Sequence, residues 1–290
     1  MPSFIDIVEA RGVVLADGGT GTNYQDMGIE PGIAPEEWVF DEPKRVVDLH
    51  RSFADVGCDL VSTCTFGGSP IRLEDGPLAG RARELNARGA ELARRAVGDD
   101  LLVAGSVGPT GQLVEPFGPL TKDIALEAFA EQALGLADGG VDVMLLETFF
   151  TLDEGLWAAE AIRAVSDLPI VMSFSFDQGT RTMMGLSPAE LTAAVDDTGV
   201  AALGANCGRS LQDTAQLVSE FSDAGVTQPL WIKPNAGVPQ VTAAGVVYPE
   251  DPQSFAMQVA EFARRGARIV GGCCGSTPEH LAALAEALGR

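Results

Sequence analysis

A short apolar run, Val141-Asp142-Val143-Met144-Leu145-Leu146, is followed at once by the acidic residue Glu147. An apolar run of this length is typical of a buried strand in a parallel sheet. The segment before it, Leu126 to Ala137, has apolar residues three and four positions apart, which indicates an amphipathic helix. Helix and buried strand together form one unit of an α/β fold, in which helices connect parallel strands.

The same alternation continues through the whole chain. Amphipathic stretches such as Arg81 to Val97 and Phe255 to Arg265 separate seven further apolar runs. These other predicted strands are Val13–Ala16, Leu60–Thr63, Leu101–Ala104, Ile170–Ser173, Ala201–Gly204, Leu230–Lys233 and Arg268–Gly271. Eight units predict an α/β protein with a single (β/α)8 TIM barrel, residues 1–290 forming one domain. An open, doubly wound sheet is the alternative. Segment 28–35, rich in Gly and Pro, is expected to be a loop.

The composition excludes several classes of function. The 290 residues include 41 acidic and 19 basic side chains, a net charge of −22, so we expect no nucleic-acid binding. No stretch reaches the roughly 18 apolar residues that cross a bilayer, so we expect no membrane association. Because the N-terminal segment lacks a signal peptide's positive region, a cytoplasmic location is expected. Five cysteines in that setting favour metal binding or catalysis over disulfides.

Polar residues follow most of the predicted strands. In a barrel the carboxyl ends of the strands share one face, where such enzymes carry their active sites. We therefore expect these side chains to lie near one another although they are far apart in sequence. They are, in chain order, Asp17, Thr63 and Thr65, Ser106, Glu147, Cys207, Asn235, and Cys273 with Cys274.

Three of the cysteines form a candidate catalytic zinc site. Cys207 lies in Gly204-Ala205-Asn206-Cys207-Gly208, and the adjacent Cys273 and Cys274 lie in Gly271-Gly272-Cys273-Cys274-Gly275. Neighbouring cysteines seldom form a disulfide with each other, and the flanking glycines let both thiols face one ion. Three protein ligands leave tetrahedral zinc one open position, as in catalytic sites. The alternatives are three buried thiols or a structural zinc. Cys58 and Cys64 are expected to be ordinary buried thiols.

Two acidic residues are candidates for binding an amine. Asp17 begins the turn Asp17-Gly18-Gly19-Thr20-Gly21-Thr22, whose backbone N–H groups could hold a carboxylate while Asp17 accepts from an amine. The turn matches neither a Walker A nor a GxGxxG pattern, so phosphate binding is not favoured. Glu147 follows a buried strand and needs a partner, which is either an internal arginine or an ammonium group of a substrate.

The remaining candidates have structural explanations. The only two histidines in the sequence, His50 and His280, fall in predicted helices, so a Ser-His-Asp or Cys-His mechanism is not expected. Asp48-x-His50 resembles the start of a corrinoid-ligating D-x-H-x-x-G motif, but Phe53 stands where the glycine is needed. The segment Ser276-Thr277-Pro278-Glu279 is typical of a helix start.

Together these residues resemble the homocysteine S-methyltransferase family of zinc-dependent barrel enzymes, over nearly the whole chain. The resemblance rests on the Asp17 turn, Thr63-Cys64-Thr65-Phe66-Gly67, Glu147-Thr148, Asn206-Cys207 and the Cys273-Cys274 motif. It implies zinc on Cys207, Cys273 and Cys274, and a homocysteine amine held by Asp17 and Glu147. The substrate-binding set is expected to include Gly18, Gly19, Thr63, Thr65, Asn206 and Asn235.

Within this family, the segment Pro234-Asn235-Ala236-Gly237-Val238-Pro239 is similar to the homocysteine module of cobalamin-dependent methionine synthase. This similarity implies that Asn235 can occupy zinc's fourth position before homocysteine binds. The betaine-using branch of the family has tyrosines where this chain has Gly67 and Thr148. A quaternary ammonium needs an aromatic cage, and Trp38 and Phe66 alone make a thin one, so betaine is not the expected donor.

The predicted reaction is methyl transfer from an activated donor to the thiol of homocysteine, which gives methionine. A sulfonium such as S-methylmethionine, a separate methyl-corrinoid protein and methylfolate remain open as donors. Two other hypotheses stay open: a corrinoid-dependent component with a different acceptor or donor, and a non-catalytic barrel that binds zinc or an amino acid.

Overall fold

The sheet of the computed structural model, which describes residues 3–242 and 245–290, is an eight-stranded parallel barrel. Its strands are β1 (Val14–Leu15), β2 (Leu60–Ser62), β3 (Leu102–Val107), β4 (Val143–Phe149), β5 (Ile170–Phe174), β6 (Ala202–Cys207), β7 (Leu230–Pro234) and β10 (Ala267–Val270). They pair in the order β1-β10-β7-β6-β5-β4-β3-β2. A parallel bridge between Ala16 and Leu60 joins the two outer strands of this order. All eight predicted strands are confirmed, and the open-sheet alternative is wrong. Residues 1, 2, 243 and 244 of the predicted domain lie outside the described residues.

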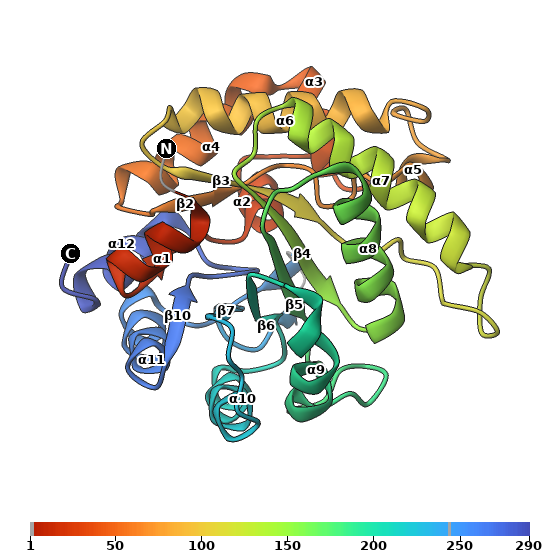
Figure 1. Cartoon of the computed structure of the whole chain (residues 1–290). Coiled ribbons are helices and arrows are strands. Elements are labelled where there is room, and N and C mark those ends of the chain that lie inside the picture. The colour runs from red at the N-terminus through yellow and green to blue at the C-terminus, as the bar shows by residue number, and fades with distance from the viewer. Residues whose placement is uncertain (1–2, 243–244) are drawn as a thin grey trace.

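Helices surround the strands on the outside of the barrel (Figure 1). They are α1 (Phe4–Arg11), α2 (Thr20–Asp26), α3 (Trp38–Asp41), α4 (Pro43–Asp55), α5 (Pro70–Leu73), α6 (Ala82–Val97), α7 (Lys122–Asp138), α8 (Leu152–Val165), α9 (Pro188–Val195), α10 (Leu211–Asp223), α11 (Pro252–Arg264) and α12 (Pro278–Ala287), with 3-10 turns η1 (Pro35–Glu37) and η2 (Asp196–Thr198). The helices predicted from apolar spacing are α6, α7 and α11. The predicted helix start is also confirmed, because Thr277 precedes α12 and Pro278 occupies its first turn.

Two separate apolar clusters hold the fold together. The inner cluster fills the barrel with one side chain or more from most strands, and Trp231 of β7 is its largest member. Phe4 and Val8 of α1 belong to the same cluster, so α1 covers the end of the barrel where the strands begin. The outer cluster lies between the strands and the surrounding helices. Because both faces of the barrel strands are buried at nearly all positions, these strands read as largely apolar runs, which is why they could be predicted.

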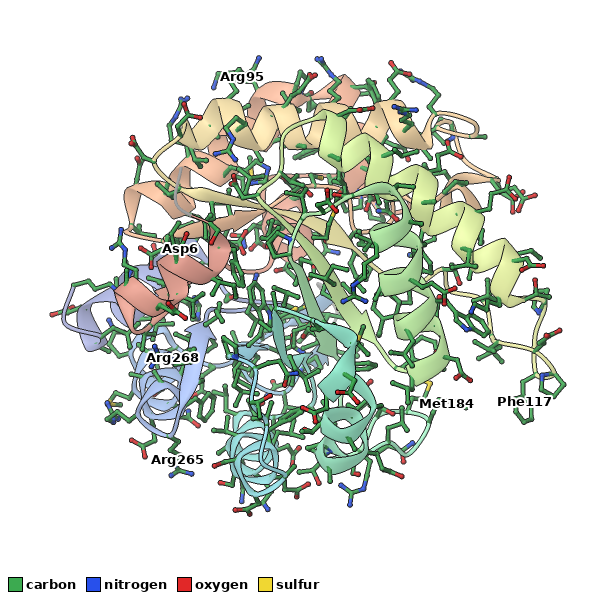
Figure 2. The ribbon with its side chains drawn as sticks, in the orientation of Figure 1. Asp6, Arg95, Phe117, Met184, Arg265 and Arg268 are labelled. Atoms are coloured by element: carbon green, nitrogen blue, oxygen red, sulfur yellow. The ribbon has the colours of Figure 1, made fainter. Side chains whose placement is uncertain are left out.

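The loops after the strands contain exposed apolar residues. Phe117, in the loop between β3 and α7, is 78% exposed and projects away from the body of the molecule (Figure 2). The loop between β7 and α11 contains a hairpin of β8 (Gln240–Thr242) and β9 (Gly245–Val247), in which Val241 is 89% exposed. This hairpin was not predicted, because its strands are exposed and bury no continuous apolar face. No helix in the described parts of the chain is long and apolar enough to cross a membrane.

His50 is fully buried in α4, and neither ring nitrogen has a hydrogen-bond partner among the described residues. Burial lowers the pKa of His50 from 6.5 to about 4, and the negative charge of Asp17 opposes this shift only in part. The imidazole is therefore neutral near pH 7. It fills space in the helix layer, in agreement with its interpretation as a helix residue without a catalytic role.

This burial predicts a loss of stability in acid. Because the unfolded chain binds a proton near pH 6.5 and the folded chain only near pH 4, stability falls as pH decreases through that window. At pH 5 we expect His50 to account for a loss of about 2 kcal/mol in the free energy of unfolding relative to pH 7.5. Urea unfolding of wild type and His50→Leu at both pH values measures it. An equal loss in both proteins would contradict the prediction.

Candidate metal centre and substrate pocket

A cavity of about 520 Å³ opens at the carboxyl ends of the strands. Most of the predicted site residues line it, namely Gly18, Gly19, Thr63, Thr65, Glu147, Cys207, Cys273 and Cys274. Asp17, Asn206 and Asn235 are buried beside it and are not part of its lining. The cavity therefore brings together residues from both ends of the chain, as expected when the carboxyl ends of parallel strands meet on one face.

The three predicted cysteines converge on one point of the cavity wall. The Sγ atoms of Cys207, Cys273 and Cys274 all lie within 4.8 Å of one another, and those of Cys207 and Cys273 are 2.7 Å apart. The backbone N–H of Cys273 donates to the carbonyl of Pro234 at 2.7 Å, which ties the cysteine pair to the end of β7. A Cβ on Gly272 would lie 2.2 Å from the Ser276 hydroxyl oxygen, so only glycine allows this loop to close beside the thiols.

Backbone strain is concentrated at this site. Cys207 and Thr148 have φ angles of 57° and 65°, and they are the two non-glycine residues with positive φ in residues 3–242 and 245–290. Left-handed backbone is uncommon for residues with a side chain and gathers at functional sites. Cys207 is the last residue of β6, and its Sγ lies next to that of Cys273. Thr148 directly follows Glu147.

Asn206 connects these two strained positions. Its Oδ1 accepts from the Thr148 backbone N–H at 2.9 Å and from the Ser173 hydroxyl at 2.7 Å. Its Nδ2 donates to the Thr148 hydroxyl at 2.7 Å and to the Sγ of Cys207 at 3.5 Å. An amide N–H that points at sulfur favours the thiolate form. Asn206 thus stabilises negative charge on the cysteine sulfurs from a buried position outside the cavity lining.

Asn235 holds the two cysteine loops against each other. Its Oδ1 accepts from the backbone N–H of Cys274 at 3.0 Å, and its Nδ2 donates to the carbonyl of Gly208 at 2.8 Å. The oxygen that was expected to reach zinc is thus already engaged by the backbone of a cysteine. The role of Asn235 as a fourth ligand stays a prediction, and its observed contacts position the ligands.

The cluster is suited to a soft divalent cation. Hydrogen bonds from the thiols of Cys207 and Cys273 lower the pKa of Cys274 to about 3, while the hydrogen bond with Cys273 raises the pKa of Cys207 well above its usual range. The contacts within the cluster therefore favour a thiolate at Cys274. Three sulfur donors at one cavity wall, without paired C-x2-C spacing, fit a zinc site that leaves a position for a ligand from the cavity.

Asp17 is engaged inside the barrel. Its side chain is fully buried, and its Oδ1 accepts from the Lys233 ammonium at 2.6 Å and from the Ser62 hydroxyl at 3.0 Å. Its Oδ2 accepts from the Ser62 backbone N–H at 2.7 Å. Both carboxylate oxygens of Asp17 thus accept hydrogen bonds from internal partners, whereas the sequence predicted that they bind an amine. Such binding of an amine by Asp17 stays a prediction.

Glu147 reaches the cavity from the end of β4. The Ser106 hydroxyl donates to its Oε1 at 2.5 Å, and burial raises the pKa of Glu147 to about 7 although the nearby Lys233 charge opposes the shift. No arginine pairs with this carboxyl among the residues that the structure describes, so the internal-arginine alternative has no support. A carboxyl group that is poised near neutrality and lines the cavity beside the thiols can accept from an ammonium group.

The glycine turn after β1 and the two threonines Thr63 and Thr65 form part of the cavity wall. The Gly19 backbone N–H donates to the Ser276 hydroxyl at 3.1 Å, and a Cβ on Gly19 would lie 2.3 Å from the carbonyl oxygen of Cys273. The turn after β1 therefore packs directly against the cysteine loop. The hydroxyls of Thr63 and Thr65 are 2.6 Å apart, and Thr65 donates to the Ser106 carbonyl at 2.8 Å. These contacts join the ends of β2 and β3.

Lys233, which lines the cavity from β7 and is 3% exposed, was not among the predicted site residues. Like Glu147, it is a charged residue at the end of an apolar run, and this pattern in the sequence indicates a buried charge that needs a partner. Glu36 and Arg72 also line the cavity. They come from η1 and α5, short elements for which the sequence carried no periodic signal.

Known proteins resemble the chain along almost its full length. The homocysteine S-methyltransferase family matches residues 14–288. The methionine synthases of Mycobacterium leprae and Mycobacterium tuberculosis are 32% and 31% identical to the chain over 98% of its length. The chain spans about a quarter of the length of these relatives (25%).

Solved structures share the fold. The oxidised form of the homocysteine methyltransferase MmuM from Escherichia coli matches with a TM-score of 0.83 and 24% identity, over 97% of each chain. Its metallated form matches with a TM-score of 0.81 and 23% identity, over 96% of this chain and 97% of that one. The extent of the family match, together with the methionine synthase relatives, shows that this chain belongs to the homocysteine S-methyltransferase family.

Proposed function

We propose that this protein transfers a methyl group from an activated donor to the thiol of homocysteine and thereby forms methionine. The observation that carries the proposal is the convergence of Cys207, Cys273 and Cys274 on one wall of a cavity that Glu147 also lines. A metal-binding thiol cluster and a carboxyl group in one cavity match the thiol and the ammonium of an amino-acid thiol. The 520 Å³ of the cavity admit such a molecule together with a small donor group.

Zinc is the ion that we propose for Cys207, Cys273 and Cys274, and when bound it supplies the positive charge that keeps a thiol deprotonated near neutral pH. The chain itself contributes binding and orientation. Glu147 accepts from the ammonium of homocysteine, and Asn206 stabilises negative charge on the cysteine sulfurs. The thiolate sulfur of homocysteine forms a bond to the methyl carbon as the bond between that carbon and the donor breaks. The side chains need to hold no general base.

The aromatic side chains near the cavity do not form a cage for betaine. The guanidinium of Arg72 lies 5.7 Å from the centroid of the Phe66 ring, and that of Arg45 lies 4.9 Å from the centroid of Trp38. Both rings therefore already interact with a cation, and Trp38 is buried outside the cavity lining. A quaternary ammonium donor finds little aromatic surface here. A sulfonium, a methyl-corrinoid protein and methylfolate are the donors that the proposal retains.

A donor panel tests the proposal. Zinc-loaded protein is incubated with homocysteine and, in turn, S-methylmethionine, S-adenosylmethionine, betaine, methylcobalamin, methylfolate and a methyl-corrinoid protein, and methionine is quantified. We expect methionine from at least one sulfonium, corrinoid or folate donor and none from betaine. Activity only with a methyl-corrinoid protein would assign the chain to a multi-component system. Absence of methionine with all these donors, including the methyl-corrinoid protein, would contradict the proposal.

A further inference from the structure

Two opposite charges line the cavity next to the cysteine cluster. Lys233 reaches it from β7 and Glu147 from β4, and no ion pair joins them among the described residues. Burial lowers the pKa of Lys233, but the carboxylates of Asp17 and Glu147 outweigh this effect and raise it above its usual value. The ammonium of Lys233 is therefore charged at neutral pH. The cavity thus offers one cationic and one anionic side chain to the same ligand.

The hydrogen bonds of Lys233 leave one of its N–H groups available. A lysine ammonium has three donors. One faces the Asp17 Oδ1 at 2.6 Å and a second faces the Ser62 Oγ at 3.3 Å. No third acceptor contacts Nζ in the described part of the chain. A buried ammonium with an open donor at a cavity wall is suited to an anionic ligand group, because an unsatisfied buried charge is costly.

Asp17 differs from Lys233 in this respect. Both of its oxygens accept hydrogen bonds within the protein, and it does not line the cavity. Asp17 is therefore an internal counter-ion of Lys233. Of the two side chains, only the positively charged ammonium of Lys233 faces the cavity and can contact a ligand.

We propose that Lys233 binds the α-carboxylate of the amino-acid thiol and that Glu147 alone binds its ammonium. This inference rests on the proposed function and deepens it, because it defines the acceptor as a zwitterion. Carboxylate and ammonium share one carbon in an α-amino acid, so two oppositely charged side chains that line one cavity can bind both groups. Asp17 is a positioning residue, because its carboxylate holds the Lys233 ammonium in place.

Two truncated thiols separate the two contacts. Aminopropanethiol is homocysteine without its carboxylate, and mercaptobutanoate is homocysteine without its amine. Their binding to the zinc-loaded protein is measured by calorimetry, which requires no methyl donor and no turnover. In Lys233→Met we expect homocysteine and mercaptobutanoate to bind about 10- to 100-fold more weakly, the range for a hydrogen bond to a charged group, and aminopropanethiol to bind as before. In Glu147→Gln the pattern should be reversed, with mercaptobutanoate unaffected.

A second variant guards against misfolding. Removal of Lys233 alone leaves Asp17 as an unpaired buried charge, which can destabilise the barrel. The double variant Asp17→Asn/Lys233→Met removes both charges and should show the same loss of selectivity for the carboxylate. Thermal unfolding and zinc content confirm that each variant is folded.

The outcomes distinguish the inference from the proposed function. Equal weakening of all three thiols in the double variant, or no weakening, would overturn the role of Lys233 while homocysteine binding by wild type stands. If wild type binds none of the three thiols, the proposed function fails and the inference fails with it.

Discussion

Cys273→Ser is expected to lose its zinc and to form methionine more than about a hundredfold more slowly than wild type. Replacing residues that merely support a metal ligand costs about 10- to 100-fold in activity, so loss of a ligand itself should cost more than the upper end of that range. Cys273 also contacts Cys207 at 2.7 Å, so the serine weakens the whole cluster. Metal analysis of protein purified with zinc should give about one ion per chain for wild type and a small fraction of that for the variant.

Cys58→Ala provides the matched control. Cys58 is also buried, but its Sγ donates to the Ala16 carbonyl at 3.7 Å and it does not belong to the cluster of three. Burial raises the pKa of Cys58, so its thiol stays protonated and is a poor metal ligand. The control should keep both zinc and activity. Unchanged zinc in Cys273→Ser, or equal loss of zinc in both variants, would remove the metal centre from the proposal.

Glu147→Gln should raise the KM for homocysteine about 10- to 100-fold while zinc remains bound, because the amide cannot form an ion pair with the substrate ammonium. The variant preserves the shape of the side chain and its contact with Ser106. Steady-state kinetics with a saturating donor and metal analysis of the same preparation give both quantities. Loss of zinc together with homocysteine binding would mean that Glu147 supports the structure of the site.

The pH dependence provides a second test of Glu147. Because the pKa of Glu147 is raised to about 7, its carboxyl is ionised above that pH and becomes neutral below it. The affinity for homocysteine should therefore decrease as pH falls from 8 to 6. The part of this decrease that comes from protonation of Glu147 should be absent in Glu147→Gln. Calorimetry at several pH values measures it. If the variant shows the same decrease as wild type, protonation of the thiol or of its ligands accounts for the effect instead.

The fold was predictable because each barrel strand is buried on both faces. Such strands must be apolar along their length, so all eight runs were visible without any knowledge of their partners. The convergence of Cys207, Cys273 and Cys274 followed as well, since the carboxyl ends of parallel strands share one face. The exposed hairpin β8–β9 and the short elements η1 and α5 were not predictable in this way, because they leave no periodic apolar pattern.

The sequence alone therefore determined the barrel, the end that carries the site and the cysteines that meet there. Only the tertiary structure decided what each polar side chain does there, because hydrogen bonds depend on distances between residues that are remote in sequence. Asp17 pairs with Lys233, 216 positions away, and the oxygen of Asn235 holds the backbone of Cys274. Apolar burial follows a local period that can be read along the chain, whereas the partner of a buried charge is set by packing in three dimensions.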